Sequence, residues 1–516
     1  MRRTVATVAV ALILAATGTA TSPSYAEEES PDLSPAVTPA APAALAEPQP
    51  AQILERAEAA LDGKVVGPHG PEATLALRDL FAALPRLSTA ERAEARQILA
   101  RPTNKAGPKG EVKYRAHAFR MCAEKVCVQR VKRTRHAATK KWAGKTLRVL
   151  QGVWRKEVGS MGYRRPFKDR GSGGNGKLDV YLANLGDRGL YGYCVPEFKI
   201  AGFKRVASAY CVLDNDFSRA EFGGKPIDTL KATAAHELFH TVQFAYDFKE
   251  DPWLMEASAT WIEERYADGV NDNRQYLPFG QLVRTWVPLD TFRTTSLVQY
   301  GNWAFFEYLS QRFGAEVVRK IWRQAGHFTG DGKTYSTEAL ERALPDGTSF
   351  KEVFARYSAA NLTPERSYPE GETWPGPKLV SRGSLGRGGR TNGTFEIDHM
   401  STHDVRVTPK KGLDKKKYKL RVTVDGPGAA ADPMATVVLQ RPSGTISYLP
   451  VALNDQGEGA RVVPFNRRQT ARVWLVLSNA STRFKDCGEK YTYSCGGTPI
   501  DDQRRFGVKL RVVTPT

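Results

Sequence analysis

The sequence predicts an α+β domain that lies between a helical N-terminal segment and a C-terminal all-β sandwich. Within residues 113–362, strand-like runs come first and apolar residues at helical spacing follow, which is typical of an α+β domain. Beyond residue 393 the apolar pattern has a period of two, in short runs separated by turn residues, as in a β-sandwich. A chain of 516 residues is long enough for about three such units.

The composition excludes two broad classes of protein. The chain has 75 Lys and Arg against 55 Asp and Glu, a net charge of +20, with 41% hydrophobic and 25% charged residues. These proportions exclude a wholly disordered chain and a protein with many membrane spans. The positive charge is spread over several segments, which favours either attraction to anionic polymers of a cell envelope or a role in solubility alone. No nucleic-acid-binding module is recognisable, so we expect no specific nucleic-acid partner.

Residues 1–26 have the pattern of a signal peptide. Arg2 and Arg3 precede an apolar run at 5–16, and Ser-Tyr-Ala at 24–26 fits a signal-peptidase site. The alternative is a single-span anchor, but the apolar run is short for the ~30 Å of a bilayer core and no second candidate span follows. We therefore expect a secreted, extracellular protein with no membrane span after cleavage.

The six cysteines fall into three pairs that are close in the sequence, and an exported chain meets oxidising conditions. A structural zinc cluster is disfavoured because the chain has no C-x-x-C pair. A cysteine at 122 that caps an active-site metal is a further alternative. The predicted disulfides are Cys122–Cys127, Cys194–Cys211 and Cys487–Cys495.

Two segments precede the α+β domain. Residues 27–50 are rich in Ala, Pro, Glu and Ser and are predicted to be a disordered leader. Residues 51–112 carry apolar residues at helical spacing, and Ser88 with Glu91 fits a capping box that opens a helix. This segment is interpreted either as a propeptide that shields the active site and assists folding, or as an ordinary N-terminal subdomain.

The remaining elements are predicted in chain order from periodicity. A glycine-rich turn at 171–176 opens a strand and lacks the Lys-Ser/Thr of a phosphate-binding loop, so it predicts no nucleotide site. Residues 363–393 are rich in Pro, Gly and Arg and are predicted to be a linker before the sandwich at 394–516. In the α+β domain we expect helices at 137–158, 227–246, 301–313, 315–324, 337–344 and 350–361, a helix that starts at Pro252, and strands at 178–182 and 207–213. In the sandwich we expect strands at 395–397, 418–424, 435–439, 460–464, 473–477 and 506–513.

The strongest functional signal is the run HELFH, in which His236 and His240 flank Glu237. Residues four apart lie on one face of an α-helix, so both imidazoles can reach one ion. Two neutral imidazoles and a carboxylate leave the fourth position of a tetrahedral Zn²⁺ open for water, whose pKa the metal lowers. Glu237 lies beside the metal rather than on it and is predicted to take the proton of that water as general base.

A third metal ligand is expected on the helix that starts at Pro252. Glu256 lies sixteen residues after His240, which leaves room for one more helical turn and a reversal of the chain. Asp247 and either Glu263 or Glu264 are the alternatives. Asp247 should lie too close to the end of the first helix, whereas Glu263 is expected to begin a solvated face.

HELFH followed by WLMEASATW resembles the gluzincin group of zinc metallopeptidases, in which a downstream glutamate completes the HExxH motif. The resemblance implies a zincin-like catalytic domain, one catalytic Zn²⁺ held by His236, His240 and Glu256, and Glu237 as general base. A wider run of the chain, about half of it, resembles a group of secreted bacterial metalloproteases. The matching runs are GNGKLDVYL (174–182), YCVLDND (210–216), TAAHELFHTVQF (233–244) and YGNWAFF (300–306).

The resemblance also implies features around the metal. Tyr300 is the candidate for stabilising an oxyanion, with aromatic packing as the alternative. The strand at 207–213 would lie beside the active helix and pair with an extended peptide substrate, or would be a plain sheet strand. Thr260 stands where an aspartate often orients a ligand histidine, so the sequence does not identify that partner.

Asp214 and Asp216 offer oxygens for Ca²⁺, but their spacing fits no calcium loop and favours a solvated turn.

These signals together predict a secreted zinc-dependent endopeptidase that acts on protein or peptide substrates. The alternative is a non-catalytic exported protein that binds the cell envelope or wall through its β-sandwich and keeps a vestigial metal site. The intact Glu237 favours the enzyme, because a site that has lost its activity has no need of a general base.

Overall fold

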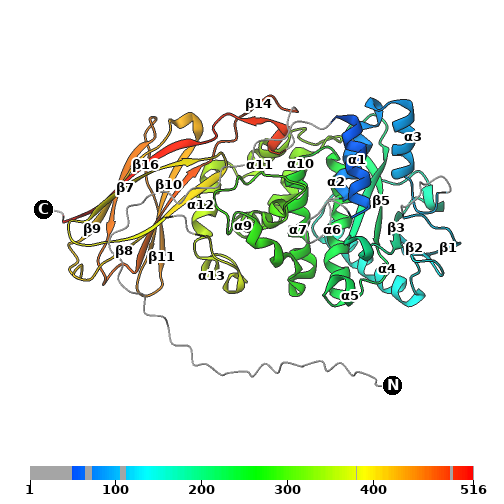
Figure 1. The fold of residues 1–516 in the computed structure, drawn as a ribbon, viewed down its shortest axis with the longest axis horizontal. Helices are drawn as coiled ribbons and strands as arrows, with labels where there is room; N and C mark the ends of the chain where they lie inside the picture. Colours follow the sequence, from blue (N-terminus) through cyan, green and yellow to red (C-terminus); the bar gives the residue numbers. More distant parts are fainter. Residues whose placement is uncertain (1–48, 64–72, 105–111, 379–380, 489–491, 515–516) are drawn as a thin grey trace, which may run out of the picture.

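The computed structural model describes residues 49–63, 73–104, 112–378, 381–488 and 492–514 (Figure 1). The predicted signal peptide, and all but the last two residues of the predicted leader, lie outside these ranges. Among the described residues, no helix is both long and apolar enough to cross a membrane. The α+β part lies at one end of the molecule and a two-sheet β-structure at the other, with helices between them (Figure 1).

The N-terminal segment forms three helices, as its apolar spacing predicts. The predicted capping box is present, because Ser88 Oγ accepts the Glu91 N–H and the Glu91 carboxylate accepts the Ser88 N–H. Apolar side chains of the segment belong to the same core as the α+β domain. The helices are α1 (Pro50–Leu61), α2 (Ala73–Ala83) and α3 (Thr89–Ile98).

The α+β domain is built on a five-stranded mixed sheet with the order β1-β2-β3-β5-β4. The three inner strands run parallel, and the two edge strands β1 and β4 pair antiparallel with their neighbours. The expected strands at 178–182 and 207–213 are β3 and β5. The strands are β1 (Ala118–Cys122), β2 (Val126–Val131), β3 (Leu178–Ala183), β4 (Gly192–Lys199) and β5 (Ala207–Asp214).

Strand β4 is an edge strand that the sequence pattern did not predict. It contains Pro196, which has no N–H to donate, and its pairing with β5 shifts register between Pro196 and Phe198. Proline is tolerated at such an edge, although it hides the strand from a pattern search. Because β5 lies between β3 and β4, both of its edges are occupied. The expectation that β5 itself pairs with a substrate is therefore wrong, and β4 holds the outer edge.

Two long helices, α6 (Pro226–Asp247) and α7 (Pro252–Ala267), form a hairpin at the centre of the domain. Helix α6 packs on β4 and β5, and α7 packs on α6 after a four-residue connection. Nearly every residue of both helices after the first turn of α6 is buried, so the hairpin is a core element rather than a surface one. The other helices of the domain are α4 (Lys140–Trp154), α5 (Arg219–Phe222), α8 (Val298–Gly301), α9 (Trp303–Phe313), α10 (Glu316–Ala325), α11 (Ser336–Ala343), α12 (Phe350–Ala360) and α13 (Pro364–Ser367).

The C-terminal part consists of two sheets that share one apolar core, with the strand orders β11-β10-β13-β8-β6 and β12-β9-β16-β7. Part of the predicted linker is structured, because α13, β6 and the start of β7 fall within it. Strand β6 pairs parallel with β8 and so belongs to the sheet, although its Arg- and Gly-containing sequence lacks an apolar alternation. The strands are β6 (Ser381–Leu385), β7 (Arg390–Ile397), β8 (Ser401–Pro409), β9 (Lys419–Asp425), β10 (Pro433–Gln440), β11 (Ile446–Pro450), β12 (Glu458–Pro464), β13 (Arg472–Asn479) and β16 (Arg504–Val513), with a short pair β14 (Phe484–Lys485) and β15 (Thr498–Pro499).

The three predicted disulfides are confirmed, with the connectivity that sequence proximity suggests. Cys194 and Cys211 are register partners on β4 and β5, so their bond joins the edge strand to the inner sheet. The Cys194 Sγ lies 3.0 Å from the carbonyl oxygen of Glu237 on α6. This disulfide therefore lies directly beneath the helix that carries the HExxH motif. The pairing of Cys122 with Cys127 leaves no thiol at 122 to cap a metal.

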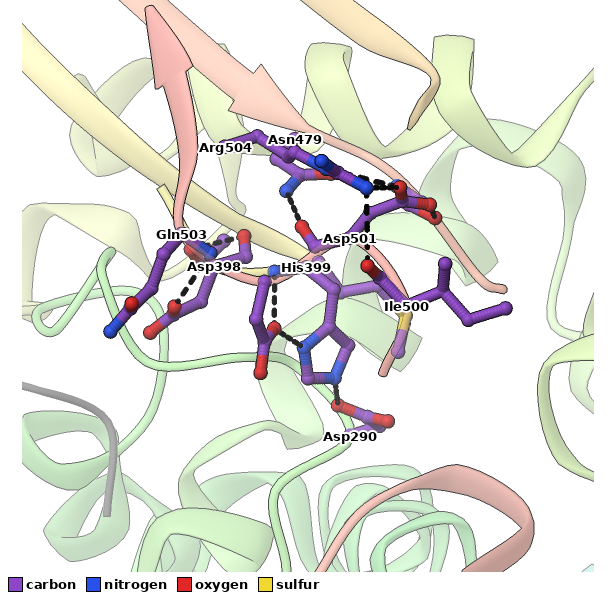
Figure 2. Close-up of polar contacts among 12 residues, drawn as sticks. Asp290, Asp398, His399, Asn479, Ile500, Asp501, Gln503 and Arg504 are labelled. Atoms are coloured by element: carbon purple, nitrogen blue, oxygen red, sulfur yellow. Dashed lines mark hydrogen bonds and ion pairs between the residues drawn. The ribbon is translucent and has the colours of Figure 1, made fainter. Parts of the chain in front are cut away.

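A buried histidine joins the helical part to the β-structure (Figure 2). His399 Nε2 lies 3.0 Å from Asp290 Oδ1, and its Nδ1 lies 2.5 Å from Asp502 Oδ1. Two carboxylates beside the ring outweigh the effect of burial and raise the pKa of His399 to about 10. Asp290 belongs to the α+β domain and Asp502 precedes β16, so a charged imidazolium lies between the two parts.

Candidate metal centre

Helix α6 presents His236 and His240 one turn apart on the same face. Their ring centroids are 4.8 Å apart. The helix continues without a break through both residues because Ala, Leu, Thr and Phe fill the other positions with buried side chains. His240 is 1% exposed and His236 is 9% exposed, and both line a pocket. The i, i+4 spacing thus gives the juxtaposition of rings that the sequence predicts.

Glu256 on α7 completes the group, as predicted. Its carboxylate oxygens lie 3.2 Å from His236 Nε2 and 3.5 Å from His240 Nε2. One ligand atom from each of the three residues lies within 4.8 Å of the others. The set of two imidazole nitrogens and one carboxylate oxygen matches the ligands that catalytic zinc sites use.

Both histidines have their other ring nitrogen held by a neighbouring side chain. His236 Nδ1 lies 2.8 Å from Glu263 Oε1, and His240 Nδ1 lies 2.7 Å from Gln243 Oε1. These contacts favour a proton on each Nδ1 and leave each Nε2 directed at Glu256. Glu263 is therefore not a third ligand, nor does it begin a solvated face; it is buried and orients His236. Thr260, which the sequence left in question, donates its hydroxyl to the backbone carbonyl of Glu256 instead.

The protonation states of the two imidazoles differ. Burial alone would lower the pKa of His236, but hydrogen bonds with Glu256 and Glu263 raise it well above its usual value. Burial lowers the pKa of His240 to about 4, so that ring is neutral. A proton shared by His236 and Glu256 would lie where a divalent cation binds. Binding of a metal ion is therefore expected to displace this proton.

Glu237 is buried beside the three potential ligands but is not one of them. Burial raises the pKa of its carboxyl to about 7, and a cation bound nearby would act in the opposite direction. Its Oε2 accepts a hydrogen bond of 3.1 Å from the hydroxyl of Thr74 on α2. A carboxylate with a pKa near neutrality is suited to accept and return a proton.

The site opens into a pocket of about 70 Å³. Tyr300, the predicted oxyanion stabiliser, lines this pocket, with its ring centroid 5.9 Å from that of His236. It also stacks on Tyr276 at 5.1 Å, so aromatic packing, the alternative role, is present as well. Tyr191 and Asp272 line the same pocket. The role of Tyr300 in stabilising charge stays a prediction.

The other candidate acids lie elsewhere. Asp247 ends α6 and accepts hydrogen bonds from Arg205, away from the pocket. Asp214 and Asp216 form a further acidic group with Glu221. However, the Asp214 carboxylate accepts backbone N–H groups from two loops, including that of Phe217 at 2.7 Å, and is buried. The predicted solvated turn therefore does not describe Asp214, and a Ca²⁺ ion at this group stays untested.

No protein-family model matches the sequence, and no curated protein matches it. Among solved structures, the pre-peptidase C-terminal domain of a collagenase from Bacillus anthracis is 13% identical, covering 26% of this chain and 96% of that one, with a TM-score of 0.15. A family GH115 4-O-methyl-α-glucuronidase is 10% identical, covering 69% of this chain and 54% of that one, with a TM-score of 0.14. Likenesses at this level assign neither a fold nor an activity to the chain.

Three functional contacts were not predicted from the sequence. Glu263 follows Glu256 by seven residues, and Gln243 follows His240 by three, so both lie on the faces that carry the ligands. That spacing could have identified them. Thr74 comes from a segment more than 160 residues away from its partner Glu237, and no local pattern indicates such a contact.

Proposed function

We propose that the protein is a secreted zinc-dependent endopeptidase with a zincin-like catalytic domain. One observation carries the proposal: two imidazoles of α6 and a carboxylate of α7 converge beside a buried glutamate that is outside the ligand set. The three disulfides support the extracellular location, because such bonds persist in oxidising compartments. The net charge of +20 supports an additional attraction to anionic envelope polymers.

The chemistry of the site follows from its residues. His236, His240 and Glu256 would hold Zn²⁺, which when bound lowers the pKa of a water molecule and polarises a carbonyl group. Glu237 would accept the proton of the attacking water and deliver it to the departing amine. Glu263 and Gln243 hold the two rings, so the ligands need no rearrangement on binding.

A peptide substrate would reach the site along β4. This strand is the edge of the sheet nearest to α6, and extended peptides bind sheet edges through their main chain. Gly192 at the start of β4 and Tyr191 before it line the pocket that contains Glu237. The arrangement supports cleavage within a chain rather than at a terminus, because β4 continues beyond the pocket to Lys199.

The variant Glu237→Gln tests the proposal. Glutamine preserves the shape of the side chain but cannot accept the proton, so we expect zinc binding to persist and cleavage to fall by about 10² or more. Zinc content is measured on the purified protein, and cleavage is measured on casein and on a quenched peptide. Glu264→Gln is the matched control, because Glu264 is also buried but bonds to Asn273 outside the pocket.

Two results would reject the proposal. Undiminished cleavage by the Glu237→Gln variant would exclude this residue as the base. Failure of the folded parent protein to bind zinc in the purified state or after reconstitution would exclude the metal centre, and it would favour the alternative of a non-catalytic envelope-binding protein.

A further inference from the structure

The N-terminal segment enters the candidate active site. Ala73 and Thr74, the first two residues of α2, line the pocket that contains the metal-binding group and Glu237. Thr74 is 5% exposed and makes two hydrogen bonds across the pocket. Its hydroxyl donates to Glu237 Oε2 at 3.1 Å, and its Oγ1 accepts the N–H of Cys194 at 3.0 Å.

Both partners of Thr74 are groups that hydrolysis would require. Glu237 is the proposed base, and an oxygen bonded to a hydroxyl is less available to an attacking water. The Cys194 N–H is on the edge strand β4, where an extended substrate would place a carbonyl oxygen. One threonine therefore occupies the proton acceptor and the main-chain donor at the same time. The N-terminal end of α2 also lies towards Glu237, which is favourable for a carboxylate.

Other contacts hold the segment in this place. Arg78, one turn further along α2, donates to the Glu250 carbonyl at 2.7 Å, in the connection between α6 and α7. Phe81 packs edge-on against Phe248 in the same connection, with ring centroids 5.3 Å apart. These contacts lie on the same side of α2 as Thr74 and tie the helix to the hairpin that carries the metal-binding group.

Arg101 anchors the far end of the segment. Its side chain is 7% exposed and forms ion pairs with Asp169 at 2.8 Å, Asp179 at 2.6 Å and Glu197 at 2.6 Å. Removal of Arg101 would leave these carboxylates without their shared cation, which is strongly unfavourable for buried groups. The segment is thus attached at two places, by Thr74 at the pocket and by Arg101 at the sheet.

We propose that the N-terminal segment holds the site in a latent state, with Thr74 blocking the general base and the substrate-binding edge of β4. This inference rests on the proposed hydrolysis at Glu237. Substrate gains access when the first turn of α2 moves away from β4, and the cleavage rate is proportional to the fraction of molecules in that open state. Of the two interpretations of residues 51–112, the contacts favour the shielding one.

The test compares Thr74→Val with Thr74→Ser in the full chain. Valine has the shape of threonine without its hydroxyl and leaves Glu237 and the Cys194 N–H without this partner, whereas serine keeps the hydroxyl. Each lost hydrogen bond shifts an equilibrium roughly fivefold. We therefore expect Thr74→Val to cleave a quenched peptide about tenfold faster or more, and Thr74→Ser to remain close to the parent. Thr89→Val is the control, because Thr89 begins α3 and is exposed.

A second measurement does not depend on catalysis. Hydrogen exchange, followed by mass spectrometry, reports on the Cys194 amide and on the first turn of α2. We expect Thr74→Val to speed exchange at both places, with Thr74→Ser and Thr89→Val unchanged. The latent state would be overturned if the parent and Thr74→Val showed equal exchange and equal cleavage. If Glu237→Gln still abolished cleavage in that case, the proposed function would remain intact. Faster exchange in a zinc-loaded Thr74→Val protein that cleaves nothing would instead overturn the proposed function, and latency with it.

Discussion

At the scale of single residues, the geometry of the site depends on the side chains that accept a hydrogen bond from Nδ1 of His236 and of His240. A histidine binds a metal well when its second nitrogen is fixed by an acceptor, because this sets both the tautomer and the orientation of the ring. Glu263 provides this for His236 and Gln243 provides it for His240. The two acceptors differ in charge, so only His236 is held between two carboxylates, those of Glu256 and Glu263.

Glu263→Gln is expected to weaken zinc binding about tenfold, since outer partners of ligand histidines typically contribute 10- to 100-fold to affinity. The amide can still accept the hydrogen bond, but it no longer places a negative charge beside the ring. The dissociation constant is measured by competition with a zinc chelator. In Glu264→Gln, which changes the neighbouring buried carboxylate, the affinity should equal that of the parent. An unchanged affinity in Glu263→Gln would show that the contact with His236 is structural only.

At the scale of elements, the close approach of β4 to α6 sets the geometry of the site. A Cβ atom on Gly192 would lie 2.8 Å from Leu213, 3.0 Å from the Glu237 side chain and 3.2 Å from Thr233. The absence of a side chain at Gly192 thus allows the edge strand to lie directly beside the proposed base. The disulfide between Cys194 and Cys211 fixes this end of β4 to the sheet.

Gly192→Ala is expected to lower the free energy of unfolding by about 1–3 kcal/mol, because the added methyl group overpacks a filled contact. It should also reduce cleavage, since relief of the overlap displaces the Glu237 side chain. Thermal denaturation and peptide cleavage are measured together. Gly383→Ala in β6 is the control, because a Cβ there meets no atom within 4 Å. Equal stability and activity in both variants would mean that α6 tolerates a wider separation from β4.

At the scale of the whole molecule, the helical part and the β-structure share buried polar contacts. His399 lies between Asp290 and Asp502, and Figure 2 shows its contact with Asp290. The second oxygen of Asp290 accepts the N–H of Ser494 at 2.8 Å. Helix α12 adds an apolar contact, because Ala359 packs with side chains of β10 and β13. The two parts are therefore expected to unfold together rather than as independent units.

His399→Gln tests this junction through its pH dependence. Because the folded pKa of about 10 lies above the unfolded value near 6.5, the protonated ring stabilises the fold fully below pH 6.5, and this contribution is lost as the pH rises through 10. We expect the variant to lose about 3–5 kcal/mol at pH 6, as when one partner of a buried ion pair is removed. The difference from the parent should shrink towards pH 10.

Urea denaturation at pH 6, 8 and 10 measures this difference. His403→Gln is the matched control, since burial lowers the pKa of His403 to about 3 and keeps that ring neutral from pH 6 to pH 10. A difference between the parent and His399→Gln that stays constant from pH 6 to pH 10 would contradict a charged His399.

Local periodicity predicted the elements that repeat a clear apolar pattern, and it missed strands both inside and at the edges of the sheets. Helices α6 and α7 and strands β3 and β5 follow their expected ranges closely. Strands β1, β2, β4, β6, β8 and β11 were not predicted. In the edge strands β4 and β6, proline, glycine and arginine interrupt the alternation, which an edge strand tolerates. Pairing across the sheet, rather than the sequence of the strand itself, determines whether such a segment is a strand.

The sequence by itself determined which side chains come together at the centre. The spacing of His236 and His240, the place of Glu256 one helix later and the three cysteine pairs all follow from short-range geometry. Only the tertiary structure decided that Thr74 lies against Glu237 and that β4, not β5, holds the sheet edge. The physical reason is that contacts between distant segments depend on how whole elements pack, and a pattern that extends over a few residues carries no information about them.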